Sequence, residues 1–348
     1  TYAFQRERYW TTSDPGLPRQ TAGHPLLGTA VELADGSGTL YTGGLSLAGH
    51  PWLADHSVGG VPLLPGTAFV EMALAAGARA GCGAVEDLTV TEPLVLPEDG
   101  EVRLQCTVGE PDASGARAFR VHAATGDDDP WTTHATGLLR PAGERPGPGL
   151  TAWPPPGAEP VALDGVYDRL AELGAEYGPR FQGLRAAWRR GDEAYAEVAV
   201  PAGTAAFGIH PALLDAALHA VGLRATAAER MALPFAWSGV ELYTRGATAL
   251  RVRISPAGPD AVRVEAADEH GRAVAQVASL SLREVDPQRI AAAAAGGHDD
   301  LFALDWTPVP VPAAPQAGRW IVLGPGREEL AGALAGEVAE VTVAADLG

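Results

Sequence analysis

Short runs of alternating apolar and polar residues recur along both halves of the chain and predict β-strands with one buried face. In the first half, apolar side chains occupy every second position at 102–108 and again at 119–121. In the second half, the same alternation appears at 194–200, 250–254 and 262–264. Period-two patterns of this kind are typical of antiparallel sheets that face a core on one side.

Each half also contains one segment with helical periodicity. Residues 66–79 repeat apolar side chains such as Phe69 and Met72 at intervals of three and four, which predicts a helix with a buried stripe. The segment 211–224 begins with Pro211, a residue that suits the first turn of a helix. We therefore expect an α+β fold of two curled antiparallel sheets, each around one long helix.

Proline and glycine divide the chain. Between 141 and 160, 11 of 20 residues are Pro or Gly, which predicts a linker between two packed halves. A second boundary near 286–300 contains a run of five alanines followed by two glycines. After it, 320–324 and 337–344 look like strands around a helix at 327–335, as at the start of a βαβ unit. Because the chain starts without Met and stops within this pattern, we expect it to be a piece of a longer protein.

Composition and charge exclude several classes of protein. With 348 residues, 46% of them apolar and 20% charged, the chain has the composition of a globular protein of two or three domains. Its net charge is −18 and all 25 basic residues are Arg, which argues against nucleic acid or an anionic membrane as a partner. Cys82 and Cys106 lack the spacing of a metal site, so we expect two buried thiols. With no membrane-spanning run and no signal segment, the expected location is the cytoplasm.

His56 is the first candidate for chemistry. It precedes a run rich in Gly and Pro that ends at Pro65-Gly66, directly before the predicted helix. The first turn of a helix leaves backbone N–H groups unpaired and favours negative charge, so a base and an oxyanion site lie ten residues apart. The alternative is a histidine that only caps a turn. Ser57 is a poor nucleophile candidate, because it points to the opposite face of an extended segment and no G-x-S-x-G motif is present.

Asp215 and His219 are four residues apart and share one face of the second predicted helix, among leucines and alanines. A carboxylate in such surroundings costs free energy unless it is paired or protonated, which makes Asp215 a candidate general acid. The alternative is an ordinary Asp–His pair on a solvated face. A metal site formed by these two residues and His210 is disfavoured, because His210 does not share their face.

A third string, Glu176 to Gly183, is a turn-prone loop with two aromatic residues. It is either a Gly-Pro turn that follows a helix at 167–173, or a loop that offers the Tyr177 phenol to a substrate oxygen.

Together these strings resemble the dehydratase domain of modular type I polyketide synthases. Four motifs carry the resemblance: His56-x-x-x-Gly60-x-x-x-x-Pro65, Asp215-x-x-x-His219, Tyr177-Gly178-Pro179 and Leu233-Pro234-Phe235. The resemblance implies a double hotdog fold, with two tandem hotdog units. The implied segments are a linker after an upstream acyltransferase at 1–20, hotdogs at 21–143 and 161–285, a Pro/Gly linker at 144–160, and a linker with the start of a ketoreductase structural subdomain at 286–348.

The activity implied by the resemblance is dehydration of a 3-hydroxyacyl thioester to an α,β-enoyl thioester. The acyl group would be carried on the phosphopantetheine of an acyl carrier protein, and the domain itself would need no cofactor and no metal. Double-bond isomerisation, oxa-Michael cyclisation by the same His/Asp pair, and an inactive acyl-binding module are the alternatives. The implied partners are the carrier protein, the acyltransferase and ketoreductase of the same module, and a second copy of the chain.

The resemblance also implies roles for individual residues. His56 would take the α-proton, the Gly66 N–H would stabilise the thioester oxygen, and Asp215 would protonate the leaving hydroxyl. His219 would orient Asp215, and Tyr177 would hold the β-hydroxyl. The implied substrate-binding residues are Gly60, Pro65, Gly178, Pro179, Leu233, Pro234 and Phe235. Ala175 stands where the family often has an aromatic residue, and the candidates for carrier docking are Arg180, Arg189 and Arg190.

Overall fold

The computed structural model describes residues 20–21, 23–126, 129–147, 149–200, 206–224, 231–258, 260–294, 319–322 and 340–343. Contacts divide the chain into a larger unit, residues 1–297, and a smaller one, residues 298–348. The larger unit contains a fourteen-stranded antiparallel sheet in its described part.

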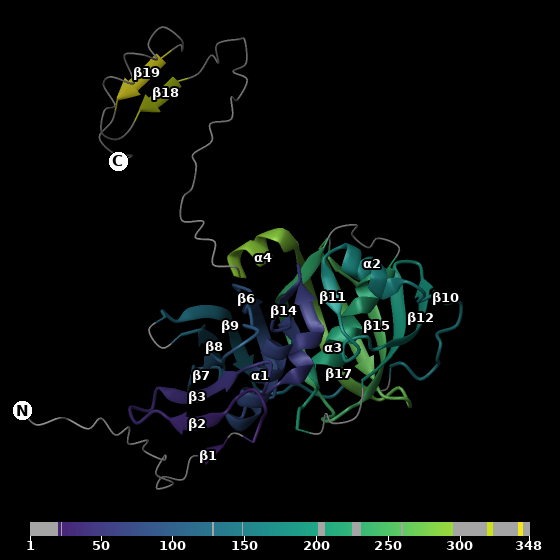
Figure 1. Ribbon diagram of the computed structural model, residues 1–348, viewed down its shortest axis with the longest axis horizontal. Helices are drawn as coiled ribbons and strands as arrows, with labels where there is room; N and C mark the ends of the chain where they lie inside the picture. The colour runs from purple at the N-terminus through teal and green to yellow at the C-terminus, as the bar shows by residue number, and fades with distance from the viewer. Residues whose placement is uncertain are drawn as a thin grey trace, which may run out of the picture. The chain divides into compact units, whose positions relative to one another are not determined.

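The first half of this sheet curls around helix α1 (Gly66–Arg79), as Figure 1 shows. Helix α1 contacts β6, β9 and β14. The strands of this half, in their order across the sheet, are β1 (Gln20–Thr21), β2 (Thr29–Glu32), β3 (Gly38–Leu45), β7 (Val102–Pro111), β8 (Arg117–Ala124), β9 (Thr132–Arg140) and β6 (Ala84–Val90). The predicted helix and the predicted strands at 102–108 and 119–121 are confirmed. Residues 67–77 of α1 are all buried, so this helix is the centre of the half.

The second half repeats the arrangement around helix α3 (Pro211–Leu218). Its strands, in order, are β14 (Ala232–Leu242), β17 (Ala273–Glu284), β16 (Ala261–Ala267), β15 (Ala249–Gly258), β13 (Glu193–Ala199), β12 (Leu184–Arg190) and β10 (Glu159–Pro160). The helix predicted over 211–224 is α-helical only to Leu218 and continues as a 3₁₀ helix, η2 (His219–Leu223). Gly222 lies in this last turn, where its low helix propensity favours an early end of the α-helix.

Two sets of backbone pairings join the halves. Strand β6 pairs with β14, so that Leu88 lies opposite Trp237 and the two curled sheets form one. A separate small sheet contains β11 (Ala175–Tyr177), β4 (His56–Val58) and β5 (Val61–Pro62), with β4 in the middle. Within it, Tyr177 of the second half lies opposite His56 of the first.

The described part of the larger unit also contains three short helices: η1 (Pro51–Asp55), α2 (Val166–Glu172) and α4 (Pro287–Ala294). Helix α4 falls in a segment predicted as linker, yet it contacts β4 and β5. The turn at Gly59 allows this approach, because its φ is +61° and a Cβ there would lie 2.4 Å from the carbonyl oxygen of Pro287. The predicted linker at 144–160 likewise ends in β10, which pairs with β12.

In the smaller unit, the structure describes β18 (Arg319–Val322) and β19 (Glu340–Val343), which pair in parallel. A parallel pair needs a crossover connection, as the predicted βαβ unit has. The helix predicted at 327–335 and the predicted linker residues 1–19 lie outside the described residues. Both cysteines are free and buried, and burial raises the pKa of the Cys106 thiol to about 12.

Trp237 lies in the β6–β14 pairing that joins the halves, and it is only 1% exposed. We therefore expect its substitution to reduce the stability of the fold strongly. Trp237→Ala leaves a cavity where β14 meets β6, so the free energy of unfolding should fall by about 3–5 kcal/mol. Trp131→Ala, at a position 40% exposed, is the matched control and should change it by about 1 kcal/mol or less. Urea denaturation followed by circular dichroism measures both. An equal decrease in the free energy of unfolding for the two variants would show that burial of Trp237 between β14 and β6 does not stabilise the fold.

Candidate active site

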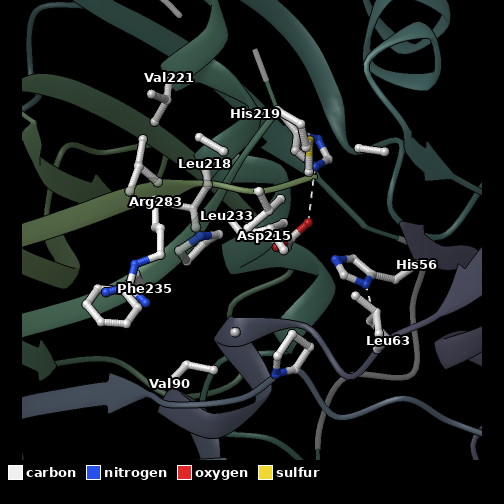
Figure 2. A pocket seen from close by; sticks show the side chains of 18 of the residues that line it. His56, Leu63, Val90, Asp215, Leu218, His219, Val221, Leu233, Phe235 and Arg283 are labelled. Atoms are coloured by element: carbon white, nitrogen blue, oxygen red, sulfur yellow. Dashed lines mark hydrogen bonds and ion pairs between the residues drawn. The ribbon is translucent and has the colours of Figure 1, made fainter. Parts of the chain in front are cut away.

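A pocket of about 340 Å³ lies where the two halves meet, and apolar side chains form most of its wall (Figure 2). The first half contributes Leu63, Leu64, Phe69, Val90 and Pro93; the second half contributes Leu170, Leu173, Ala175, Leu218, Val221, Met231, Ala232, Leu233, Pro234, Phe235, Leu282 and Val285. Few polar side chains reach it, and His56, Tyr177, Asp215 and His219 are among them. An apolar pocket with a few convergent polar groups is the usual form of a small-molecule site.

His56 begins strand β4 and is 4% exposed. Its Nδ1 lies 3.0 Å from the carbonyl oxygen of Leu63, which can only accept a hydrogen bond, so Nδ1 carries the proton. The other ring nitrogen, Nε2, is then unprotonated, and Figure 2 shows it on the side of the ring that faces Asp215. Burial lowers the pKa of His56 below 6.5, with an opposing contribution from Asp215. His56 is thus a neutral imidazole with a free lone pair in the pocket.

Asp215 and His219 come from the other half of the molecule. The predicted sharing of a helix face is confirmed, since His219 Nε2 lies 3.1 Å from Asp215 Oδ2. Asp215 is 4% exposed and His219 7%, which excludes the alternative of a pair on a solvated face. With Oδ2 engaged by His219, Oδ1 is the oxygen left for another partner.

Tyr177 lies at the end of a strand, not in the loop that the sequence predicted. Strand β11 pairs with β4 over three residues, and the Tyr177 ring centroid is 5.6 Å from that of His56 and 4.2 Å from that of His219. Burial raises the pKa of Tyr177 well above 10, so the phenol keeps its proton. The pairing partner of β11 lies about 120 residues earlier in the chain, and no local pattern could have shown it.

Gly66 is the first residue of α1 and lines the pocket. As the first helical residue it has an N–H for which the helix offers no acceptor. A Cβ at Gly66 would lie 3.3 Å from Pro234 Cβ, tighter than most such contacts. The predicted triplet Leu233, Pro234 and Phe235 also lines the pocket, from the start of β14.

Four other predicted substrate-binding residues do not line the pocket among the described residues: Gly60, Pro65, Gly178 and Pro179. They lie in the segments next to the elements that form the pocket wall. Pro65 is the N-cap residue of α1, and the Gly60 N–H donates to Glu176 Oε2 at 3.1 Å. The Gly178 N–H donates to the carbonyl oxygen of Asp55 at 2.8 Å, which extends the β4–β11 pairing by one step.

The three arginines predicted for carrier docking differ in their surroundings. All three, Arg180, Arg189 and Arg190, are exposed. Arg190 is held within the second half by Glu193, at 2.9 Å, and by the Tyr195 hydroxyl, at 2.7 Å.

Sequence reasoning missed two features of the site. The carbonyl of Leu63 fixes the tautomer of His56, but a backbone group leaves no trace in residue identity. Arg283 lies at the pocket with its guanidinium carbon 3.5 Å from the centre of the Phe235 ring, from a strand far away in the sequence. In the part of the chain that the structure describes, no group of three His, Cys, Asp or Glu side chains is arranged to hold a metal. No described helix is long and apolar enough to cross a membrane.

The environment of His56 predicts its titration. Burial lowers its pKa in the folded state, so the ring should titrate below 6.5 and carry its proton on Nδ1 above that pH. The unfolded chain then binds more protons as the pH falls below about 6.5, and this residue lowers stability in that range. Nitrogen-15 NMR of the ring, assigned with His56→Gln, measures both properties. A titration above 6.5, or a proton on Nε2, would contradict this geometry.

Comparison with known proteins agrees with this architecture. The family described as "Polyketide synthase dehydratase domain" matches residues 24–124, and that described as "Polyketide synthase dehydratase N-terminal domain" matches residues 145–291. Polyketide synthase GfsA of Streptomyces halstedii is 52% identical over 98% of this chain and 5% of its own length. Pikromycin polyketide synthase component PikAII of Streptomyces venezuelae is 49% identical over 100% of this chain and 10% of its own length. The chain thus spans a tenth or less of these relatives.

Solved structures match about three quarters of the chain. A dehydratase from work on the borrelidin and fluvirucin polyketide synthases is 47% identical with a TM-score of 0.74, over 77% of this chain and 98% of its own. The erythromycin dehydratase is 44% identical with a TM-score of 0.72, over 76% and 98%. The predicted double hotdog fold is confirmed. The chain therefore belongs to the polyketide synthase dehydratase family, and as a dehydratase it is a hydro-lyase of polyketide synthesis.

Proposed function

We propose that the chain removes water from a 3-hydroxyacyl thioester, with His56 as the base and Asp215 as the acid. One observation carries this proposal: the two side chains come from different halves of the molecule and both reach the same apolar pocket. An acyl chain placed between them would meet a proton acceptor on one side and a proton donor on the other.

The first step is loss of the α-proton. Nε2 of His56 takes the proton from Cα, and the electron pair of the C–H bond moves toward the thioester carbonyl. The Gly66 N–H, at the positive end of α1, supports this proposal because it can donate to the oxygen on which negative charge develops. The neutral state of His56 supports its role, since only the unprotonated ring can accept a proton.

The second step is loss of the hydroxyl group. As the proposed acid, Asp215 gives a proton to the β-hydroxyl as the C–O bond breaks, so that water and an α,β-enoyl thioester form. His219 donates from Nε2 to Oδ2, which leaves Oδ1 to carry the transferable proton and stabilises the carboxylate that remains. The proton on His56 then passes to Asp215, directly or through water, and the pair is reset. These steps use only groups of the chain itself.

Tyr177 is proposed to hold the β-hydroxyl. Its ring contacts that of His56, the proposed base, and that of His219, the hydrogen-bond partner of the proposed acid. Its phenol stays protonated and can donate a hydrogen bond to the hydroxyl oxygen.

The partners belong to the same proposal. The substrate is delivered on the phosphopantetheine of an acyl carrier protein of the same module, with an acyltransferase before and a ketoreductase structural subdomain after this chain, in a cytoplasmic homodimer. With a net charge of −18, attraction of an acidic carrier cannot come from the overall field. Local arginines such as Arg180, Arg189 and Arg190, all exposed, are the candidates for docking.

Asp215→Asn tests the acid directly. Asn keeps the shape and the hydrogen-bonding capacity of the side chain but has no proton to release, so kcat should fall by about 10²–10⁴-fold. His56→Ala should fall by a similar factor because the base is gone. The assay is the loss of 18 mass units from a synthetic 3-hydroxyacyl pantetheine thioester. Turnover of Asp215→Asn at the parent rate would refute the acid assignment, and a product of unchanged mass in the parent chain would favour isomerisation or cyclisation.

Gly178→Ala tests whether the pairing of β11 with β4 positions the residues of the site. A Cβ at this position would lie 2.5 Å from the Asp55 side chain, which also accepts from the Arg180 N–H at 2.9 Å. The clash should separate β11 from β4 and lower kcat/KM by about 10- to 100-fold. Gly147→Ala is the control, because no atom lies within 4 Å of a Cβ there. Equal activity of the two variants would mean that the pairing at Gly178 does not position the site.

A further inference from the structure

Two buried polar side chains on α1 have no part in the proton transfers described above. Thr67 and Glu71 are four residues apart, so they lie on one face of the helix, and both are 0% exposed. Glu71 is a charged residue within eleven consecutive buried positions of α1. Burial of a carboxylate is costly unless its hydrogen bonds are satisfied, so its partners explain why it is tolerated.

The partners of Glu71 lie directly before helix α3. Its Oε1 accepts from the Gly208 N–H at 2.5 Å, and its Oε2 accepts from the Ile209 N–H at 2.9 Å. Oε1 also lies 2.9 Å from His24 Nε2. His24 Nδ1 accepts from a backbone N–H at 3.2 Å, so Nε2 carries the proton and donates to Glu71. The carboxylate thus receives three hydrogen bonds, two of them from the backbone that leads into α3.

Thr67 reaches the first residue of α3. Its Oγ1 donates to the carbonyl oxygen of Pro211 at 3.1 Å. In an α-helix this carbonyl also accepts from the N–H four residues later, which is that of Asp215. His210, between the two anchored points, caps the helix through Nδ1, which accepts from the Ala212 N–H at 3.1 Å.

Helix α1 also begins with Gly66, the proposed donor to the thioester oxygen. We propose that Thr67 and Glu71 are positioning residues that fix α3, and with it Asp215, at a set distance from Gly66. Apolar contacts between the two helices are non-directional and permit sliding. Three directional hydrogen bonds from one face of α1 to residues 208, 209 and 211 prevent such sliding. Asp215 and Gly66 therefore keep a constant distance from each other. This inference rests on the proposed function, because it gives Asp215 the role of the acid.

Thr67→Val tests the inference, since it removes the hydroxyl at nearly constant shape. The kcat of the 348-residue chain should fall about tenfold while KM changes by less than about twofold, because a misplaced acid affects the reacting geometry more than acyl binding. Thr67→Ser keeps the hydroxyl and should stay within about twofold of the parent. Glu71→Gln loses one hydrogen-bond acceptor, so its kcat should be reduced at least as much as that of Thr67→Val.

A second measurement separates positioning from stability. In the Asp215→Asn chain the acid is already lost, so adding Thr67→Val should cost no further activity. A full tenfold loss in that background would overturn the inference, and so would a Thr67→Val chain that melts earlier but keeps the parent kcat at 25 °C. If Asp215→Asn itself retained the parent rate, the proposed function would fail, which is a different outcome from normal activity of Thr67→Val alone.

Discussion

The proposed mechanism requires a base from one half and an acid from the other to reach one pocket, and a backbone pairing of three residues is one of the contacts that hold the halves together there. Strand β4 carries His56 and β11 carries Tyr177, and the two residues lie opposite each other in that pairing. The pairing continues at both ends, through Gly59 N–H to Gly174 and Gly178 N–H to Asp55, each at 2.8 Å. Because strand register is discrete, the position of His56 relative to the second half is fixed to within one residue step.

The apolar surroundings of the pocket favour a reaction between uncharged groups. Apolar residues of both halves enclose the pocket, and an apolar wall disfavours charge on the groups inside it. The proposed reaction begins from the neutral imidazole of His56 and ends with a neutral enoyl product and water, so it suits such a place. In the proposed mechanism, Gly66 at the start of α1 donates to the developing oxyanion, and α3 carries the proposed acid, Asp215, at a buried position.

The sequence was informative wherever a signal was local. The periodicity of Phe69 and Met72 located α1, and the spacing of Asp215 and His219 placed them on one face, as their 3.1 Å contact confirms. Tyr177 was interpreted as part of a loop, because a three-residue strand has no readable period and its partner is remote. Glu71 did leave a local signal, a lone charge in an apolar helix. Its hydrogen-bond partners, Gly208 and Ile209, lie far away in the sequence and could be identified only from the folded structure.

In the proposed mechanism, one bound acyl group touches His56 and Asp215 at the same time. A crystal structure of the chain with a stable amide analogue of a 3-hydroxyacyl pantetheine thioester tests this most directly. We expect Cα of the acyl group about 3–3.5 Å from His56 Nε2. We also expect the β-hydroxyl about 2.6–3.2 Å from Asp215 Oδ1. An acyl group bound in the pocket with its hydroxyl beyond reach of Asp215, or with Cα turned away from His56, would contradict this mechanism.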